Sequence, residues 1–364
     1  MSKGTIFKKE SNIFYDKKTH AKIRQVTDHP SINHHPFFTI PAYDNNMNRL
    51  FFVSHRTGKP QIFCEERCEK EIVQLTDLNI EINEWSVHPS FDGKYVYFTA
   101  GTGGFRVHTE SLKEEKMFDF NGQLRDNGMV ASAMGTTALS HDNRWWAVRY
   151  TDANTSCILI IDTDTGVSET ILRRDSVSHM QFCPDDSDLL YYAGPLNDRV
   201  WLINRDGTGN RRLYERNKEG KEWITHESWI PGTMELAFVD WPKGIRCINV
   251  KSNTKRRITS FNAWHAACNH KGTMMIADTN FPDIGLQLFN PLDGVGKPKT
   301  LCYPQASSMG DHWSKPFPYD NGPIAVNAPQ HTHPHPVFSP DGKLVVYTSD
   351  ISGFAQVYEV EIAI

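Results

Sequence analysis

The sequence has no long hydrophobic run, no strong excess of charge of either sign and no set of closely paired cysteines. No apolar stretch approaches the roughly 20 residues that a membrane-spanning helix needs. The N-terminal stretch MSKGTIFKKESNIFYDKK contains no apolar run long enough for a secretory signal peptide. The formal net charge of −4 over 364 residues does not indicate a protein that binds nucleic acid. We therefore expect neither a nucleic-acid partner nor a membrane partner.

The seven cysteines are scattered along the chain, and an odd number cannot be fully paired in disulfides. Cys64 and Cys68 are close in sequence, but no second close pair completes a zinc site with four thiolates. We therefore interpret the cysteines as mostly buried thiols in a reducing compartment, and we expect a cytoplasmic protein.

One short pattern recurs seven times: an apolar segment, a turn containing Asp, Gly or Pro, and an apolar strand. The clearest copy is SPDG at 339–342, followed by LVVY at 344–347. The strands of the other copies begin at Leu50, Tyr95, Trp145, Leu189, Leu236 and Met274. The turn chemistry predicts a hairpin in each copy. Repeats about 40 to 50 residues apart are typical of propeller blades.

We therefore predict an all-β fold, a seven-bladed β-propeller that forms a single domain over residues 1–364. No segment rich in proline and glycine divides the chain, and a hydrophobic content of 39% is enough for a large core. The segment 13–27 predicts two strands joined by a turn before the first repeat. We expect this N-terminal strand material to pair with the last blade, because closing the ring removes exposed sheet edges.

A cluster of metal-capable side chains lies in the segment QHTHPH at 330–335. His333 and His335 are two residues apart, so on an extended chain both side chains point to the same side. Gln330 lies just upstream and can add an amide oxygen. Imidazoles with one neutral oxygen suit a borderline divalent transition metal. The alternative is an inert surface loop, since histidine next to proline also occurs there.

Six histidines lie just before hairpins of the repeat: His35, His88, His179, His226, His265 and His335. Strand beginnings in a propeller line the central channel on one face, so these side chains are expected to converge near the axis. His265 and His335 occupy matching places in neighbouring repeats, and we expect them to meet at one metal ion. For His35, His88 and His179 the alternative is a packing habit of the repeat.

The chain resembles the oligogalacturonate lyases, a family of pectin-degrading enzymes built on a seven-bladed β-propeller. The resemblance lies in RVWLINRDG at 199–207, THESWIP at 225–231, the region of His265, and QHTHPHP at 330–336. These stretches follow the family's order and similar separations, and the similarity is clear from about Gly166 to the C-terminus. The family carries His-Glu-Gly-Pro where this chain has YAGP at 192–195, so the exact sugar stays open.

The resemblance implies a manganese ion bound by His265, Gln330, His333 and His335. It also implies that His226 is the base that abstracts a proton and that Arg199 is essential. We place His179 with Arg199 in substrate binding. The expected activity is metal-assisted β-elimination, which cleaves the 4-linked glycosidic bond of short oligogalacturonates such as digalacturonate and trigalacturonate to unsaturated uronate products.

This chemistry needs these residue types. Removing the proton at C5 of a uronate places negative charge beside a carboxylate, and a divalent metal neutralises that carboxylate as a Lewis acid. A neutral imidazole such as His226 is a suitable base near pH 7. Arg199 can grip a carboxylate with two hydrogen bonds. The structural alternatives are a satisfied pair of His226 with Glu227, and a surface role for Arg199.

Two other function classes stay open on the sequence alone. One is a propeller lyase that acts on a different uronate oligosaccharide, from ulvan or a rhamnogalacturonan. The other is a non-catalytic, TolB-like propeller that serves as a binding module and shares the Ser-Pro-Asp-Gly hairpin. The second class predicts no convergence of His265, Gln330, His333 and His335.

Overall fold

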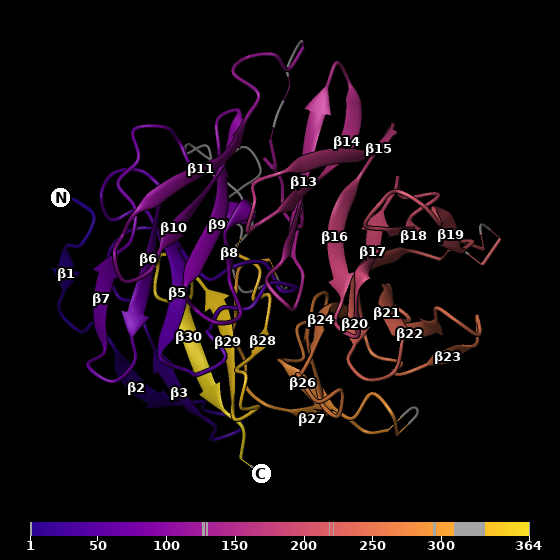
Figure 1. The fold of residues 1–364 in the computed structure, drawn as a ribbon. Coiled ribbons are helices and arrows are strands. Elements are labelled where there is room, and N and C mark those ends of the chain that lie inside the picture. The colour runs from indigo at the N-terminus through magenta and orange to yellow at the C-terminus, as the bar shows by residue number, and fades with distance from the viewer. Residues whose placement is uncertain are drawn as a thin grey trace, which may run out of the picture.

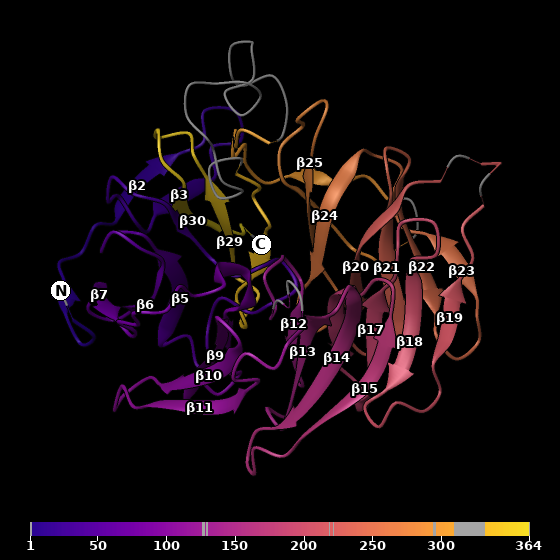
Figure 2. The same cartoon turned by 90° about the horizontal axis from the view of Figure 1, so that it is seen from above.

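The computed structural model describes residues 2–125, 128, 130–217, 219–220, 222–293, 296–308 and 332–363. The regular structure in these residues is strand, apart from one short 3₁₀ helix, η1 (Glu84–Ser86). The strands form seven antiparallel sheets that follow one another around a ring (Figures 1 and 2). The predicted seven-bladed β-propeller is confirmed.

Each of the first three blades runs from an innermost strand to an outermost one. From the inside outward, the first blade contains β4 (Asn33–His34), β5 (Arg49–Ser54), β6 (Gln61–Glu66), β7 (Glu71–Gln74) and β1 (Ile6–Phe7). The second contains β8 (His88–Pro89), β9 (Tyr95–Ala100), β10 (Gly103–His108) and β11 (Glu114–Asp119). The third contains β12 (Thr137–Leu139), β13 (Trp145–Asp152), β14 (Thr155–Asp162) and β15 (Ser168–Arg174).

The other four blades continue the ring in the same order. The fourth contains β16 (Ser178–Cys183), β17 (Asp186–Ala193), β18 (Val200–Asn204) and β19 (Arg211–Tyr214). The fifth contains β20 (Ile224–Ile230), β21 (Glu235–Asp240), β22 (Gly244–Asn249) and β23 (Lys255–Arg257). The sixth contains β24 (Ala263–Cys268), β25 (Met275–Thr279), β26 (Gln287–Phe289) and β27 (Lys299–Thr300). The seventh contains β28 (Val337–Phe338), β29 (Leu344–Ser349), β30 (Gln356–Glu361), β3 (Lys22–Gln25) and β2 (Asn12–Tyr15).

The turn between the first two strands of a blade explains why each hairpin forms where the sequence predicts it. In the seventh blade the Ser339 hydroxyl donates to Asp341 Oδ1 at 2.6 Å and accepts from the Leu344 amide at 2.9 Å. Gly342 has a φ of +71°, in the left-handed region where a side chain is disfavoured. Ser90 makes the same hydroxyl contact with Asp92, at 2.7 Å, in the second blade. Local turn chemistry therefore sets the start of the second strand.

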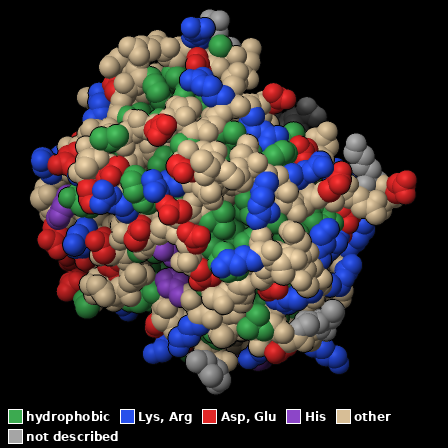
Figure 3. All heavy atoms as spheres, turned by 45° about the vertical axis from the view of Figure 1, so that its right-hand side comes forward, with side chains coloured by type: hydrophobic (Ala, Val, Ile, Leu, Met, Phe, Trp, Pro, Cys, Tyr) green, Lys and Arg blue, Asp and Glu red, His purple; other side chains and the backbone are tan. Residues whose placement is uncertain are grey.

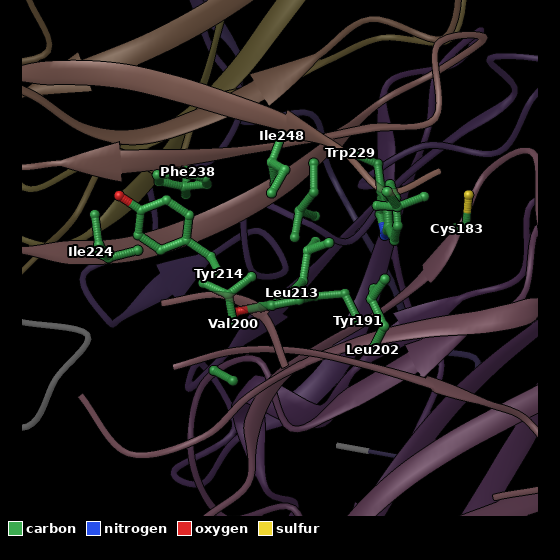
Figure 4. Packing of buried hydrophobic residues seen from close by; sticks show 13 residues of the cluster. Cys183, Tyr191, Val200, Leu202, Leu213, Tyr214, Ile224, Trp229, Phe238 and Ile248 are labelled. Atoms are coloured by element: carbon green, nitrogen blue, oxygen red, sulfur yellow. The ribbon is translucent and has the colours of Figure 1, made fainter. Parts of the chain in front are cut away.

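The apolar core lies between neighbouring blades, because each sheet buries both faces. Between the fourth and fifth blades, Tyr191 and Leu202 pack against Trp229 and Phe238 (Figure 4). Tyr191 and Phe238 are fully buried. Burying one large apolar side chain contributes about 1.5–3 kcal/mol, so each interface between blades is strongly stabilising. On the face drawn in Figure 3, acidic and basic side chains are interspersed, in agreement with the small net charge.

N-terminal strands close the ring, as predicted. β3 pairs with β30 of the last blade, where Arg24 lies opposite Glu359. The Arg24 guanidinium also binds Glu65 of the first blade at 2.6 and 2.8 Å, so this side chain joins the two blades that meet at the closure. β1 adds a contact that the sequence did not lead us to expect, because it pairs with β7 of the first blade.

The inner strand of the first blade is interrupted. β4 ends at His34, and pairing with β5 resumes only at the bridge between Tyr43 and Leu50. The intervening segment 35–41, which we call the channel loop, contains the fully buried Phe37 and Phe38. This loop fills the channel below the histidine cluster that the sequence predicts.

Two further expectations concern cysteines and membranes. All seven cysteines are free, and most of them are buried, as expected. Within the described ranges, no helix has the length and apolar character needed to span a membrane.

Candidate active site

Three neighbouring inner strands contain a β-bulge at the same level. In β16, β20 and β24 two residues lie opposite one residue of the next strand. The bulged pairs are His179–Met180, His226–Glu227 and Trp264–His265. A bulge breaks the regular alternation of a strand and re-aims side chains.

The bulges are accompanied by unusual backbone angles. His179 and His226 have φ values of +47° and +49°, and His335, just before β28, has +46°. Residues other than glycine rarely adopt this left-handed region, and where they do, the surrounding structure holds them there. These three histidines occupy the same register position in their blades, two residues before regular pairing resumes.

Histidine rings from these three blades and from the seventh blade meet at one end of the channel. Ring centroids lie 5.8 Å apart for His179 and His226, and 4.2 Å apart for His226 and His265. The ring of His265 is 4.3 Å from that of His335 and 5.3 Å from that of His333. Of the six histidines expected to converge, His179, His226, His265 and His335 do so, and His333 joins them.

His265, His333 and His335 have the geometry of a metal site. Their ligand atoms all lie within 4.8 Å of one another. His265 Nδ1 lies 2.8 Å from Asp278 Oδ2, which leaves Nε2 for a metal, the usual arrangement for a ligating imidazole. His335 Nε2 is buried without a hydrogen-bond partner in the described ranges, so it also has a lone pair or proton to use. Gln330, the predicted fourth ligand, lies outside the described residues.

Arg199 is held beside the histidines by a buried carboxylate. Its Nε and Nη2 donate to the two carboxylate oxygens of Glu227 at 2.6 and 3.1 Å. Nη2 also donates to His179 Nδ1 at 3.1 Å, so Nε2 of His179 carries that ring's proton. Burial would lower the pKa of Arg199, but the charge of Glu227 raises it above its ordinary value. The guanidinium is therefore charged and fixed in direction.

His226 is partly buried and has a neutral ring. Burial lowers its pKa well below the ordinary value, and nearby His265 and His179 add to this effect. Its Nδ1 has no hydrogen-bond partner among the described residues. The ring of Trp264 meets it edge to face at 4.7 Å. His226 can therefore accept a proton.

The channel loop forms the floor of the site. Phe38 lies 5.1 Å from the ring of His265, and Phe37 lies 5.0 Å from the ring of His335. Gly135 closes the floor on another side, where a Cβ would lie 3.0 Å from both Phe37 and the backbone of His179. Apolar side chains thus separate the histidines from the rest of the channel, which strengthens electrostatic interactions in the site.

Two of the six predicted histidines, His35 and His88, lie outside the cluster of rings. His35 Nε2 donates to the His335 carbonyl at 2.7 Å, and its Nδ1 accepts from the Thr348 hydroxyl at 2.6 Å, so it supports the site from behind. His88 lies lower in the channel, 6.1 Å from Phe91. His88 pairs with Tyr97 and corresponds to Val337 of the seventh blade, so it lies two residues nearer to the turn than His335. A His-Pro sequence before a hairpin does not reveal the distance to the turn.

The register also corrects one equivalence. His265 and His335 were expected at matching places in their repeats, but Trp264 holds the place that corresponds to His335. His265 follows it and corresponds to Glu227 of the fifth blade. The two histidines still meet, because they approach the same point from adjacent blades.

Several residues of the site were not anticipated from the sequence: Phe37, Phe38, Trp264 and Asp278. Only Asp278 could have been anticipated, because a correct strand register places it opposite the bulged pair that contains His265. The aromatic residues show no local pattern that separates them from ordinary core residues.

Comparison with known proteins identifies the family of the chain. The family model described as Oligogalacturonate lyase matches residues 1–363. The chain belongs to the oligogalacturonate lyase family. The oligogalacturonate lyase of Dickeya dadantii is 25% identical over 390 residues, which cover 98% of this chain and 97% of that protein. The oligogalacturonide lyase of Pectobacterium atrosepticum has the same identity and coverage.

Solved structures of oligogalacturonate lyases have the same fold. One, an oligogalacturonate lyase in complex with manganese, is 22% identical with a TM-score of 0.84 and covers 100% of this chain and 99% of that chain. The oligogalacturonate lyase of Vibrio parahaemolyticus is 21% identical, with the same TM-score and coverage. The expected enzyme class, a lyase of the oligogalacturonate lyase family, is confirmed by the family match.

Proposed function

We propose that this protein cleaves short oligogalacturonates, such as digalacturonate and trigalacturonate, by β-elimination. One observation carries the proposal: a cluster of metal-capable imidazoles, a neutral histidine and a fixed arginine share one end of the channel. Membership of the oligogalacturonate lyase family supports the choice of substrate.

We assign the metal site to His265, His333 and His335, with Gln330 as the proposed fourth ligand. Manganese is the proposed metal, and the manganese complex of a related lyase supports it. A divalent metal at this site supplies positive charge that neutralises the carboxylate of the substrate. The histidine donors with Asp278 behind His265 fit a divalent transition metal.

The protein side chains perform the remaining steps. His226 accepts the C5 proton, since its low pKa keeps the ring neutral at pH 7. The electron pair of the C5–H bond forms the C4–C5 double bond, and the bond from C4 to the glycosidic oxygen breaks. That oxygen leaves with the electron pair of the broken bond and takes a proton from water. Arg199, oriented by Glu227, offers the two N–H groups of Nη1 to the substrate, and His179 adds the proton on Nε2.

The deciding experiment is His226→Ala, assayed by the absorbance of the unsaturated uronate product. We expect turnover of digalacturonate and trigalacturonate to fall by about two to four orders of magnitude, the usual loss for a general base. The matched control is His270→Ala, which removes an exposed histidine from the turn at the other end of β24. A folded, metal-loaded His226→Ala protein with wild-type turnover would contradict the proposed role.

The same assay separates the alternatives. A wild-type protein that cleaves another uronate oligosaccharide but no galacturonate would keep the chemistry and change the substrate. A protein that binds uronates without any cleavage would favour the TolB-like binding module. We also propose that residues 1–364 form one domain and act in the cytoplasm, and a single cooperative unfolding transition would support the first of these points.

A further inference from the structure

Arg149 on β13 has no acidic partner in the described part of the chain. Its Nη2 donates only to the Ser156 hydroxyl at 3.3 Å, and its Nε is buried without a partner there. Burial lowers the pKa of Arg149, and no described carboxylate opposes this effect. Arginine nevertheless stays charged in proteins, and charges that leave water are normally paired.

Several other arginines do have carboxylate partners. They include Arg24, Arg49, Arg106, Arg246 and Arg256 on strands and Arg199 just before β18, each within 2.9 Å of a Glu oxygen. Arg149 therefore differs from these six arginines.

The position of Arg149 connects it to the active site. Its amide donates to the Thr136 carbonyl at 2.9 Å. The preceding residue, Gly135, accepts from the Met180 amide at 2.9 Å, and a Cβ there would contact the backbone of His179. Arg149 thus lies at the end of the third blade that adjoins His179.

The side of the strand is also defined. Ala147 and Ile158 pack in the apolar cluster that contains Met180 and Tyr192 of the fourth blade. Arg149 alternates with Ala147 along β13 and pairs with Ile158, so it faces the fourth blade as well. The Arg149 side chain is partly exposed there, between the third and fourth blades.

A second arginine adds positive charge at this place. Arg174 lies opposite Ser156 in the register of the third blade, and Ser156 is the contact of Arg149. Its Nη1 donates to the Tyr192 hydroxyl at 3.0 Å, while its nearest carboxylate, Asp198, is 3.8 Å away. The gap between these two blades therefore carries positive charge that the described residues do not fully neutralise.

We propose that Arg149 binds the carboxylate of a uronate ring adjacent to the ring that loses its proton. The inference rests on the proposed function, because every ring of an oligogalacturonate carries one carboxylate. A guanidinium matches a carboxylate with two parallel hydrogen bonds. Arg149 would then select oligomers whose neighbouring ring is charged over those in which it is esterified.

The test compares two proteins, one with Arg149 and one with Arg149→Met. Each is given unmodified trigalacturonate and three mono-esters, in which the carboxylate of one ring at a time is esterified. Binding is measured by calorimetry on metal-loaded protein in a His226→Ala background, so that the oligomer stays intact. With Arg149 present, esterifying the ring that it contacts weakens binding by about 10- to 100-fold, the range for a hydrogen bond to a charged group. In Arg149→Met we expect that ester to have no effect. Equal effects of every ester in both proteins would overturn the proposal.

Controls separate this site from general effects. Arg205→Met removes a partly exposed arginine that pairs with Asp188 at 2.8 Å, and it should keep the full sensitivity to the ester. Arg149→Lys retains the charge and should show an intermediate effect, which also provides the test if Arg149→Met folds poorly. Wild-type cleavage of unmodified trigalacturonate is measured in parallel. Its absence contradicts the proposed function, whereas cleavage without coupling contradicts only the Arg149 site.

Discussion

At the scale of single residues, the site depends on side chains that orient the reactive groups. Asp278 binds both the backbone amide of His265, at 2.6 Å, and its Nδ1, at 2.8 Å. Glu227 accepts hydrogen bonds from two nitrogens of the Arg199 guanidinium, and no part of the Glu227 side chain is exposed. Carboxylates behind the reactive residues therefore set the direction of the imidazole and of the guanidinium.

Asp278→Ala should weaken metal binding by about 10- to 100-fold, because the partner of a ligating histidine fixes its tautomer and orientation. The dissociation constant is measured by competition with a chelator of known affinity. Asp278→Asn keeps a hydrogen-bond acceptor and should lose less. Asp188→Asn, at an exposed carboxylate, is the control. An unchanged dissociation constant in Asp278→Ala would show that His265 does not bind the metal through the predicted nitrogen.

At the scale of elements, short irregular segments do more for the site than the regular strands. The bulges in β16 and β20 place His179 and His226, and the channel loop brings Phe37 and Phe38 beneath the rings. The helix η1 adds Glu84, which binds the imidazoles of His34 and His55 at 3.0 and 2.8 Å.

Phe38→Ala should lower the free energy of unfolding by about 3–5 kcal/mol, since it removes a fully buried aromatic side chain and leaves a cavity. Urea denaturation measures the change. Phe354→Ala is the matched control, because that ring is 40% exposed. A loss below about 1 kcal/mol for Phe38→Ala would mean that the channel loop collapses to refill the space.

Glu84 should make the free energy of unfolding depend on pH in the acidic range. Burial raises its pKa, but the hydrogen bonds with His34 and His55 together outweigh burial. The pKa is therefore lowered from an ordinary value of 4.5 to about 2. A lowered carboxyl pKa stabilises the fold above pH 4.5, and the contribution is lost as pH falls toward 2. Between pH 7 and pH 2 the wild type should lose on the order of 2–3 kcal/mol that Glu84→Gln does not lose.

Urea denaturation at several values of pH measures this difference. Glu69→Gln, which changes an exposed glutamate of the turn after β6, should follow the wild type. Parallel stability curves for Glu84→Gln and the wild type would contradict the role of Glu84.

At the scale of the whole molecule, stability depends on closing the ring. The seventh blade contains strands from both ends of the chain, and Arg24 connects it to the first blade through Glu65. Glu65 and Glu359 are 1% and 3% exposed, so their charges need the arginine. A closed ring in turn keeps the histidines of adjacent blades at fixed distances.

Arg24→Ala should lower the free energy of unfolding by about 3–5 kcal/mol, because it removes the bidentate partner of buried Glu65 and one of the two arginines that bind buried Glu359. Lys22→Ala is the control on the same strand, since Lys22 and Glu361 form an exposed ion pair that contributes about 1 kcal/mol or less. Both values come from urea denaturation. Similar small losses in the two variants would mean that strand pairing alone closes the ring.

The sequence alone determined the repeat, the turns and most of the histidine cluster. Turn chemistry and strand alternation act over a few residues, so the seven hairpins and the spacing of His333 and His335 could be read directly. These local features identify the blades, and the closed ring then follows from the pairing of edges. The stretches around Arg199, His226, His265 and Gln330 also resemble those of the family to which the chain belongs.

Only the tertiary structure decided what surrounds those histidines. A bulge shifts register by one residue without a local sequence signal, so Trp264 rather than His265 corresponds to His335, and Asp278 lies opposite. The floor formed by Phe38 and the surroundings of the Arg149 charge depend on contacts between blades that are far apart in sequence. Such contacts form only when the ring closes, because each blade buries its faces against its neighbours.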